Sequence, residues 1–163
     1  MAYIYFDNCA TTQPYPEVTA KVVEMLTKKY GNPSSEHLKG RESKKELEEA
    51  RLEIARSLGA LPEEIYFTSG GTESDNLAIK GACLAHSHIG THIVTTTVEH
   101  PAVTKTIRDL KRQGWKVDYI SAIGGRLDLD QMEKSINKQT VLVSIMLVNN
   151  ETGSIFPVEK IKE

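Results

Sequence analysis

Apolar residues recur every three or four positions in two stretches of the first third of the chain. The first stretch predicts a helix over 16–29, which the Gly-Asn-Pro sequence at 31–33 brings to an end. The second predicts a helix over 41–58, with Gly59 as its C-terminal cap. Four positions of this helix form one apolar face among many charged residues: Leu47, Ala50, Ile54 and Leu58.

From residue 65 onward, short β-branched runs alternate with amphipathic runs. Strands are predicted at 65–68, 91–97, 116–121 and 140–148, and helices at 73–85, 101–113 and 128–136. Asp128 and Gln131 form a capping-box pattern at the start of the last of these helices. The nearly unbroken apolar run at 140–148 is typical of a strand that helices cover on both faces. This alternation predicts an α/β fold: a mostly parallel sheet with helices on both faces.

Composition and charge narrow the function classes. The chain has 163 residues, 39% of them hydrophobic and 26% charged, which is typical of one globular domain or a large piece of one. Because 20 basic and 22 acidic residues are interspersed, nucleic acid and anionic membranes are poor candidate partners. No run approaches the ~20 apolar residues of a membrane span, and no signal peptide is evident, so a cytoplasmic location is predicted.

Neither the cysteines nor the histidines predict a metal site. Cys9 and Cys83 form no CxxC pair, and the five histidines lack ligand-like spacing. Cys83 lies among small apolar residues of a predicted helix and is interpreted as a core residue. No histidine lies near Cys9 in the sequence to activate it as a nucleophile.

Three polar segments follow predicted strands, at 69–73, 98–101 and 149–153. Ligands of open parallel sheets bind beyond the carboxyl ends of the strands, so these segments are the candidate site. Ser69-Gly70-Gly71-Thr72 opens a helix, where unpaired N–H groups suit a phosphate, although an ordinary capped turn would have the same sequence. Neither GxxxxGK[ST] nor GxGxxG is present, which removes the main support for nucleotide binding.

The other two segments have equally plain alternatives. His100 lies between a strand and a helix and is either a catalytic residue or a surface residue that caps the helix. Asn149-Asn150-Glu151-Thr152-Gly153 follows the strand expected to be the most buried, so it is either a ligand-binding loop or simply a turn.

Taken in order, five segments resemble the signatures of the cysteine desulfurases, enzymes of the class V aminotransferase type that use pyridoxal 5′-phosphate (PLP). These segments are Asp7–Thr12, Tyr30–Ser35, Phe67–Asn76, Glu99–Val103 and Val143–Gly153. The resemblance implies an aspartate aminotransferase-like large domain. It also implies that residues 1–163 are the N-terminal segment and part of that domain, without its remainder and without the C-terminal small domain.

The resemblance also implies roles for particular residues. Gly71 and Thr72 would hold the cofactor phosphate, and Asn150 would hydrogen-bond the phenolic oxygen. His100 would stack on the pyridine ring and act as a catalytic proton shuttle. Four residues would lie on the substrate side: Asn8, Ala10, Thr11 and Asn32.

The implied reaction converts L-cysteine to L-alanine and leaves an enzyme persulfide for iron–sulfur cluster assembly or tRNA thiolation. The implied assembly is a homodimer, with a sulfur-acceptor or scaffold protein as partner. The family's Schiff-base lysine and persulfide cysteine lie beyond the matched segments, so the chain alone is expected to be inactive. Three alternatives stay open: a selenocysteine lyase-like enzyme, a non-catalytic α/β binding or dimerisation module, and a nucleotide-binding α/β domain.

Overall fold

The computed structural model describes residues 4–161, and the chain forms two compact units that divide between Phe67 and Thr68. The sequence carries no linker at this point. A strand was predicted at 65–68, but these residues are not a strand, because no strand of the described residues pairs with them. The boundary therefore lies in an extended segment. Its β-branched and aromatic residues are typical of strands, which explains the wrong prediction.

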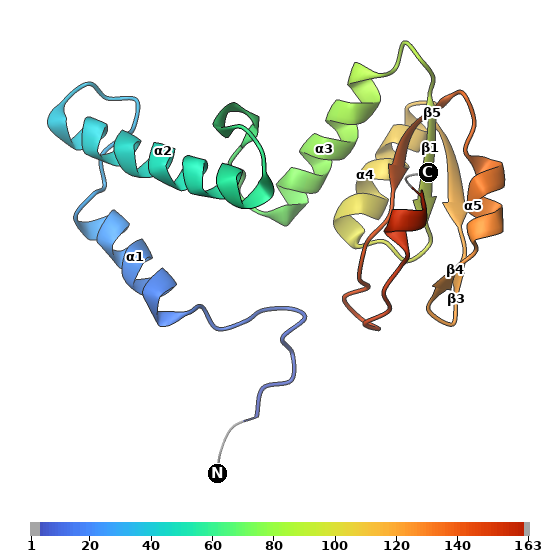
Figure 1. Ribbon diagram of the computed structural model, residues 1–163, viewed down its shortest axis with the longest axis horizontal. Coiled ribbons are helices and arrows are strands. Elements are labelled where there is room, and N and C mark those ends of the chain that lie inside the picture. Colours follow the sequence, from blue (N-terminus) through green and yellow to red (C-terminus); the bar gives the residue numbers. More distant parts are fainter. Residues whose placement is uncertain (1–3, 162–163) are drawn as a thin grey trace. The chain divides into compact units, whose positions relative to one another are not determined.

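The first unit contains α1 (Pro16–Thr27), α2 (Leu38–Leu58) and a single 3-10 turn, η1 (Pro62–Glu64), as drawn in Figure 1. Both predicted helices are confirmed. Helix α2 begins three residues before the predicted start because His37 caps it: its Nδ1 accepts a hydrogen bond from the Gly40 amide at 3.3 Å. Gly59 ends α2 in the left-handed conformation with φ 65°, as predicted.

The loop between α1 and α2 packs closely against the start of α2. A Cβ atom at Gly40 would collide with the Ser35 carbonyl, and one at Gly31 would collide with the Lys39 carbonyl. The Ser43 hydroxyl, which is buried, donates a hydrogen bond to a carbonyl of this loop at 2.7 Å. Glycine is therefore required at both positions because two backbone segments touch there.

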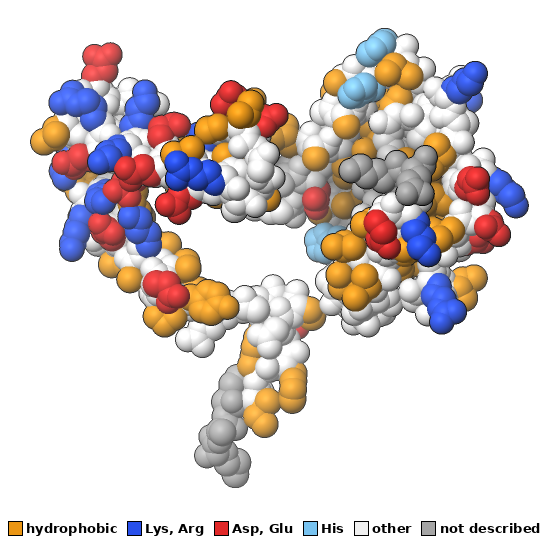
Figure 2. All heavy atoms as spheres, viewed as in Figure 1, with side chains coloured by type: hydrophobic (Ala, Val, Ile, Leu, Met, Phe, Trp, Pro, Cys, Tyr) orange, Lys and Arg blue, Asp and Glu red, His pale blue; other side chains and the backbone are white. Residues whose placement is uncertain are grey.

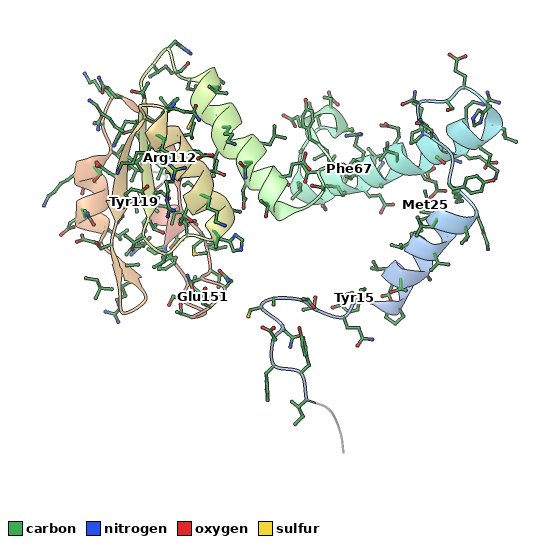
Figure 3. All side chains as sticks on the ribbon, turned by 180° about the vertical axis from the view of Figure 1, so that it is seen from behind. Tyr15, Met25, Phe67, Arg112, Tyr119 and Glu151 are labelled. Atoms are coloured by element: carbon green, nitrogen blue, oxygen red, sulfur yellow. The ribbon has the colours of Figure 1, made fainter. Side chains whose placement is uncertain are left out.

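The apolar faces predicted for these two helices are not buried. Val22 is 51% exposed, Leu26 72% and Leu58 70%, and no residue of α1 is buried. The described part of this unit contains no sheet, and α1 and α2 leave most of their apolar side chains exposed. Figure 2 shows basic and acidic side chains interspersed over α2. The guanidinium of Arg51, in the second half of α2, packs over the ring of Phe67, which Figure 3 labels, 5.0 Å from its centroid.

The second unit is the predicted α/β structure. Its elements are α3 (Gly71–Ala85), β1 (His92–Thr96), α4 (Pro101–Arg112), β2 (Lys116–Ile120), β3 (Ala122–Ile123), β4 (Arg126–Leu127), α5 (Leu129–Ser135), β5 (Thr140–Ser144) and η2 (Val158–Ile161). Strands β2, β1 and β5 pair in this order, all parallel, which confirms the predicted parallel sheet. Strands β3 and β4 form a short hairpin that the sequence did not predict.

Successive residues of β1 divide the core into two clusters. Ile93 packs against α3 and α4 with Ile79, Cys83, Val103, Ile107, Leu110 and Trp115. Val94 packs on the other face with Ile120, Leu127, Met132 and Phe156. This alternation places α3 and α4 on one face and α5 on the other (Figure 1). Helices on both faces and Cys83 as a core residue are therefore confirmed.

The run at 140–148 is a shorter and less buried strand than predicted. Strand β5 ends at Ser144 and lies at an edge of the sheet, so its residues are only half-buried. The fully buried strand is β1, because it lies in the centre of the sheet. Pro157 directly precedes the 3-10 helix η2.

Side chains fix two other elements. Asp128 caps α5 by accepting from the Gln131 amide at 2.8 Å, whereas the Gln131 side chain accepts from the Ser121 amide instead of completing a capping box. His92 is buried at the start of β1, with its Nδ1 2.8 Å from the Thr140 hydroxyl and its Nε2 3.3 Å from an Asp118 oxygen. His92 therefore joins all three parallel strands.

Among the helices of residues 4–161, none has the length and apolar character needed to cross a membrane.

Replacing Ile107 by Ala is expected to destabilise the second unit by about 2–5 kcal/mol, because the fully buried side chain would leave a cavity. Urea unfolding followed by fluorescence reports on this unit, since the single tryptophan, Trp115, lies in the same cluster. The control Ile123→Ala removes a side chain that is 81% exposed and should change stability by less than about 0.5 kcal/mol. Equal effects of the two variants would contradict this packing.

In the first unit, hydrogen bonds from Lys21 and Lys29 lower the pKa of Glu46 from 4.5 to about 2. A folded-state pKa below the unfolded value means that this stabilisation is present above about pH 4.5 and is lost as the pH falls toward 2. A carboxyl ¹³C titration should show this midpoint, and Lys21→Met should raise it. The control Lys45→Met alters only an exposed pair with Glu49 and should leave the midpoint unchanged. A wild-type midpoint near 4.5 would contradict the ion pairs.

Candidate functional site

Two of the three polar segments follow neighbouring strands of the sheet. Strands β1 and β5 are parallel and adjacent, with Thr95 paired to Ser144 at their carboxyl ends. The segment with His100 follows β1 and the segment with Asn150 follows β5. Both segments therefore lie beyond the carboxyl ends of the strands, on the same side of the sheet. The third segment opens α3, which packs against β5 and α4.

The start of α3 offers an open anion site. Gly71 and Thr72 are its first two residues, so their N–H groups have no partner within the helix. A Cβ atom built at Gly70 or Gly71 would meet nothing within 4 Å, which leaves room for a phosphate beside the backbone. An alanine at position 71 would therefore fit without a clash. These residues suit a phosphate group in both charge and space.

Hydrogen bonds within the loop give this site its shape. The Glu73 carboxylate accepts from both the amide and the hydroxyl of Ser69 at 2.6 Å, and these bonds lower the pKa of Glu73. The hydroxyls of Thr68 and Ser74 lie 2.7 Å apart. The Glu73 carboxylate is therefore hydrogen-bonded to Ser69, a contact that the sequence did not indicate.

A pocket of about 250 Å³ lies between the starts of α3 and α4. It is lined by Thr72, Asn76, His100, Pro101, Ala102, Lys105, Thr106 and Asp109. Two of the predicted cofactor residues, Thr72 and His100, thus share one pocket although 28 positions separate them in the sequence. Lys105 and Asp109 also line it, and their spacing of four and eight residues from Pro101 on α4 was the sequence signal that could have indicated them.

His100 caps α4, as one of the two alternatives held. Its Nδ1 accepts a hydrogen bond from the Ala102 amide at 3.1 Å. In the neutral ring the proton is then on Nε2, which makes no hydrogen bond to any of the residues described. The cap and a ligand role are compatible, because the cap uses one ring nitrogen and fixes the orientation of the ring.

The two asparagines after β5 have different surroundings. Asn149 is buried, and its Oδ1 accepts from the amides of Glu151 and Thr152 at 3.0 and 2.9 Å. Asn150 is exposed, and its side chain has no hydrogen-bond partner in the described part of the chain. The turn therefore leaves the Asn150 amide accessible; Figure 3 labels Glu151, the next residue, in this loop.

The four residues predicted for the substrate side belong to the first unit. The amides of Ala10 and Thr11 donate to the Asp7 carbonyl in a tight turn, and the Asn8 side chain donates to the Tyr5 carbonyl at 3.4 Å. The Asn32 side chain accepts from the Ser34 amide at 2.9 Å. The structure gives each a local role in a turn, and their substrate role stays a prediction.

The first unit also has a pocket, of about 400 Å³, between α1 and α2. Its charged lining residues are already paired, since Glu46 binds both Lys21 and Lys29. Within residues 4–161, no group of three or more His, Cys, Asp or Glu side chains could hold a metal ion. The edge of the sheet in the second unit is therefore the stronger candidate site.

Comparisons with known proteins agree with the resemblance that the five segments indicated. A cysteine desulfurase of Trichormus azollae is 50% identical over 162 residues, which is 99% of this chain and 40% of that protein. A solved NIFS-like protein matches with a TM-score of 0.91 and 40% identity, over 98% of this chain and 44% of that one. A structure of SspA in complex with cysteine matches with a TM-score of 0.87 and 35% identity, over 96% and 46% of the two chains.

This chain spans about 40% of the length of the Trichormus azollae relative. The family described as Aminotransferase class-V matches residues 4–163. Because that match extends over almost all of the sequence, the chain belongs to the class-V aminotransferase family.

Proposed function

We propose that this chain supplies part of the PLP site of a cysteine desulfurase, which converts L-cysteine to L-alanine and transfers the sulfur to an enzyme cysteine. The observation that carries the proposal is that Thr72 and His100 line one pocket at the starts of α3 and α4. The sequence identity to cysteine desulfurases supports the reaction, and the cysteine bound in the SspA structure supports the substrate class.

Two residues that line the pocket, Thr72 and His100, and two outside its lining, Gly71 and Asn150, fit PLP in chemistry. Gly71 and Thr72 would hold the phosphate at the start of α3, where the backbone is open to approach. His100 would lie against the pyridine ring, and the Asn150 amide would donate to the phenolic oxygen. When bound, PLP supplies an electron sink for bond cleavage at the substrate amino acid.

The cap on α4 determines which proton His100 can offer. Since Nδ1 accepts from the Ala102 amide, the proton on Nε2 is the one available to a substrate. Moving a proton onto Nδ1 would break the cap. We therefore propose that His100 acts as a donor through Nε2, with its ring held in place by the helix. Asn8, Ala10, Thr11 and Asn32 are proposed to contribute on the substrate side.

The proposed whole enzyme has more parts than this chain. We propose that residues 1–163 correspond to the N-terminal segment and part of the large PLP-binding domain, and that the enzyme is a cytoplasmic homodimer with a sulfur-acceptor protein as partner. Exposed apolar side chains such as Val22 and Leu26 support burial against another polypeptide surface.

Thr72→Val is expected to weaken binding of 4-deoxypyridoxine 5′-phosphate about tenfold, because it removes the hydroxyl beside the phosphate. This PLP analogue has no aldehyde, so it cannot react with surface lysines, and isothermal titration calorimetry measures its binding directly. The control Thr91→Val changes an exposed threonine outside the pocket and should bind like the wild type. Tighter binding of ATP or NAD than of the analogue would overturn the proposal.

The 163-residue chain by itself is expected to release no sulfide from L-cysteine in the presence of PLP and a reductant. The sequence has no counterpart of the family's cofactor-binding lysine or persulfide cysteine, so neither covalent step can occur. Methylene blue detection of sulfide and amino acid analysis for alanine measure the outcome. Stoichiometric formation of alanine by the purified chain would contradict the assignment of these steps to residues outside it.

A further inference from the structure

The two turns that carry His100 and Asn150 are joined by side chains beyond the point where the strand ladder ends. The last paired residues of β1 and β5 are Thr95 and Ser144, and the Thr95 hydroxyl donates to the Ser144 carbonyl at 3.0 Å. After them the backbones separate into two turns. Two buried polar side chains then bridge the turns: Glu99 from one and Asn149 from the other.

Glu99 bridges from the turn after β1 to the segment after β5. Its side chain is only 9% exposed, and its Oε1 accepts from the Thr96 hydroxyl at 2.7 Å and from the Met146 amide at 2.9 Å. Burial raises the pKa of Glu99, whereas these two hydrogen bonds oppose the rise. An acidic side chain is rarely buried unless it is paired, and this one lies directly before His100.

Asn149 bridges in the opposite direction. Its Nδ2 donates to the Val98 carbonyl at 3.2 Å, while its Oδ1 accepts three hydrogen bonds from its own turn, including one from the Thr152 hydroxyl at 3.1 Å. Asn149 is 8% exposed and lies directly before Asn150. One buried amide therefore both shapes its own turn and attaches it to the other.

We propose that Glu99 and Asn149 are positioning residues, which hold the His100 ring and the Asn150 amide at a fixed separation for the cofactor ring. In each turn the buried residue bridges to the other turn, and the exposed residue after it faces outward. The cofactor would then meet a preformed pair of contacts and would not have to order two separate loops. This inference rests on the proposed function.

Binding of two anions separates positioning from folding. Glu99→Ala and Asn149→Ala are expected to weaken 4-deoxypyridoxine 5′-phosphate binding about tenfold, because each loses a bridge between the turns. Inorganic phosphate, which needs only the start of α3, should bind both variants as it binds the wild type. Glu99→Gln keeps the oxygen that accepts both hydrogen bonds and should bind the analogue within about twofold of wild type. Equal losses for both anions would overturn the inference.

The ligand-free chain provides a readout that does not depend on the cofactor. Among the Hε1–Cε1 signals of the five histidines, Glu99→Ala should shift that of His100 and leave those of His86 and His88 in place. The control Glu133→Ala removes an exposed carboxylate of α5 and should shift none of the three. An unchanged His100 signal in Glu99→Ala would overturn the inference. Failure of the wild type to bind the analogue would instead count against the proposed function alone.

Asn149→Asp keeps the test decisive if an alanine variant fails to fold. Its carboxylate retains the acceptor oxygens for the turn but cannot donate to the Val98 carbonyl. Weaker binding of the analogue, unchanged binding of phosphate and a shifted His100 signal are expected. Wild-type behaviour in all three measurements would show that the bridge between the turns has no positioning role.

Discussion

The second unit depends on the complete burial of strand β1 between two parallel neighbours. Its residues point alternately to the two faces of the sheet, so Ile93 enters the cluster under α3 and α4, and Val94 enters the cluster that includes α5. Every β1 backbone group can pair only if β2 and β5 stay in register beside it. That register brings the ends of β1 and β5 to one edge of the sheet, where the proposed cofactor contacts are.

Polar side chains hold the chain in place beyond the last backbone hydrogen bonds between β1 and β5. Buried polar groups must be hydrogen-bonded, and in a protein interior their partners are few, so each such group specifies a local geometry. Glu99 and Asn149 satisfy this requirement by bonding across two turns. At the opposite ends of the strands, where β1 begins, the His92 side chain contacts residues of both neighbouring strands. The sheet thus has polar connections at both ends and apolar packing between them.

The first unit is stabilised in a different way. Its helices have caps, a closely packed loop and a network of ion pairs around Glu46, but few buried apolar residues. Surface ion pairs contribute little to stability. Burial of the exposed apolar side chains of α1 and α2 would stabilise this unit more. This agrees with the chain's spanning only part of the length of its relatives.

The sequence by itself determined the local features. Proline at the start of α1, Gly59 at the end of α2 and the Asp128 cap act within a few residues, so the elements they delimit were predicted correctly. The order of the five segments likewise indicated the family, and the glycine loop indicated the proposed phosphate site. Each of these signals lies within its own segment and needs no knowledge of how distant segments pack.

Only the tertiary structure decided which elements are buried and which residues meet. The apolar run after residue 140 has the composition of a central strand, yet β5 is an edge strand because strand order depends on pairing between distant segments. Residues 65–68 have strand-like composition but no partner strand among the described residues. Likewise, the sequence could not separate Asn149 from Asn150: their side chains are identical, and only the packing of one turn against another buries the first and leaves the second exposed.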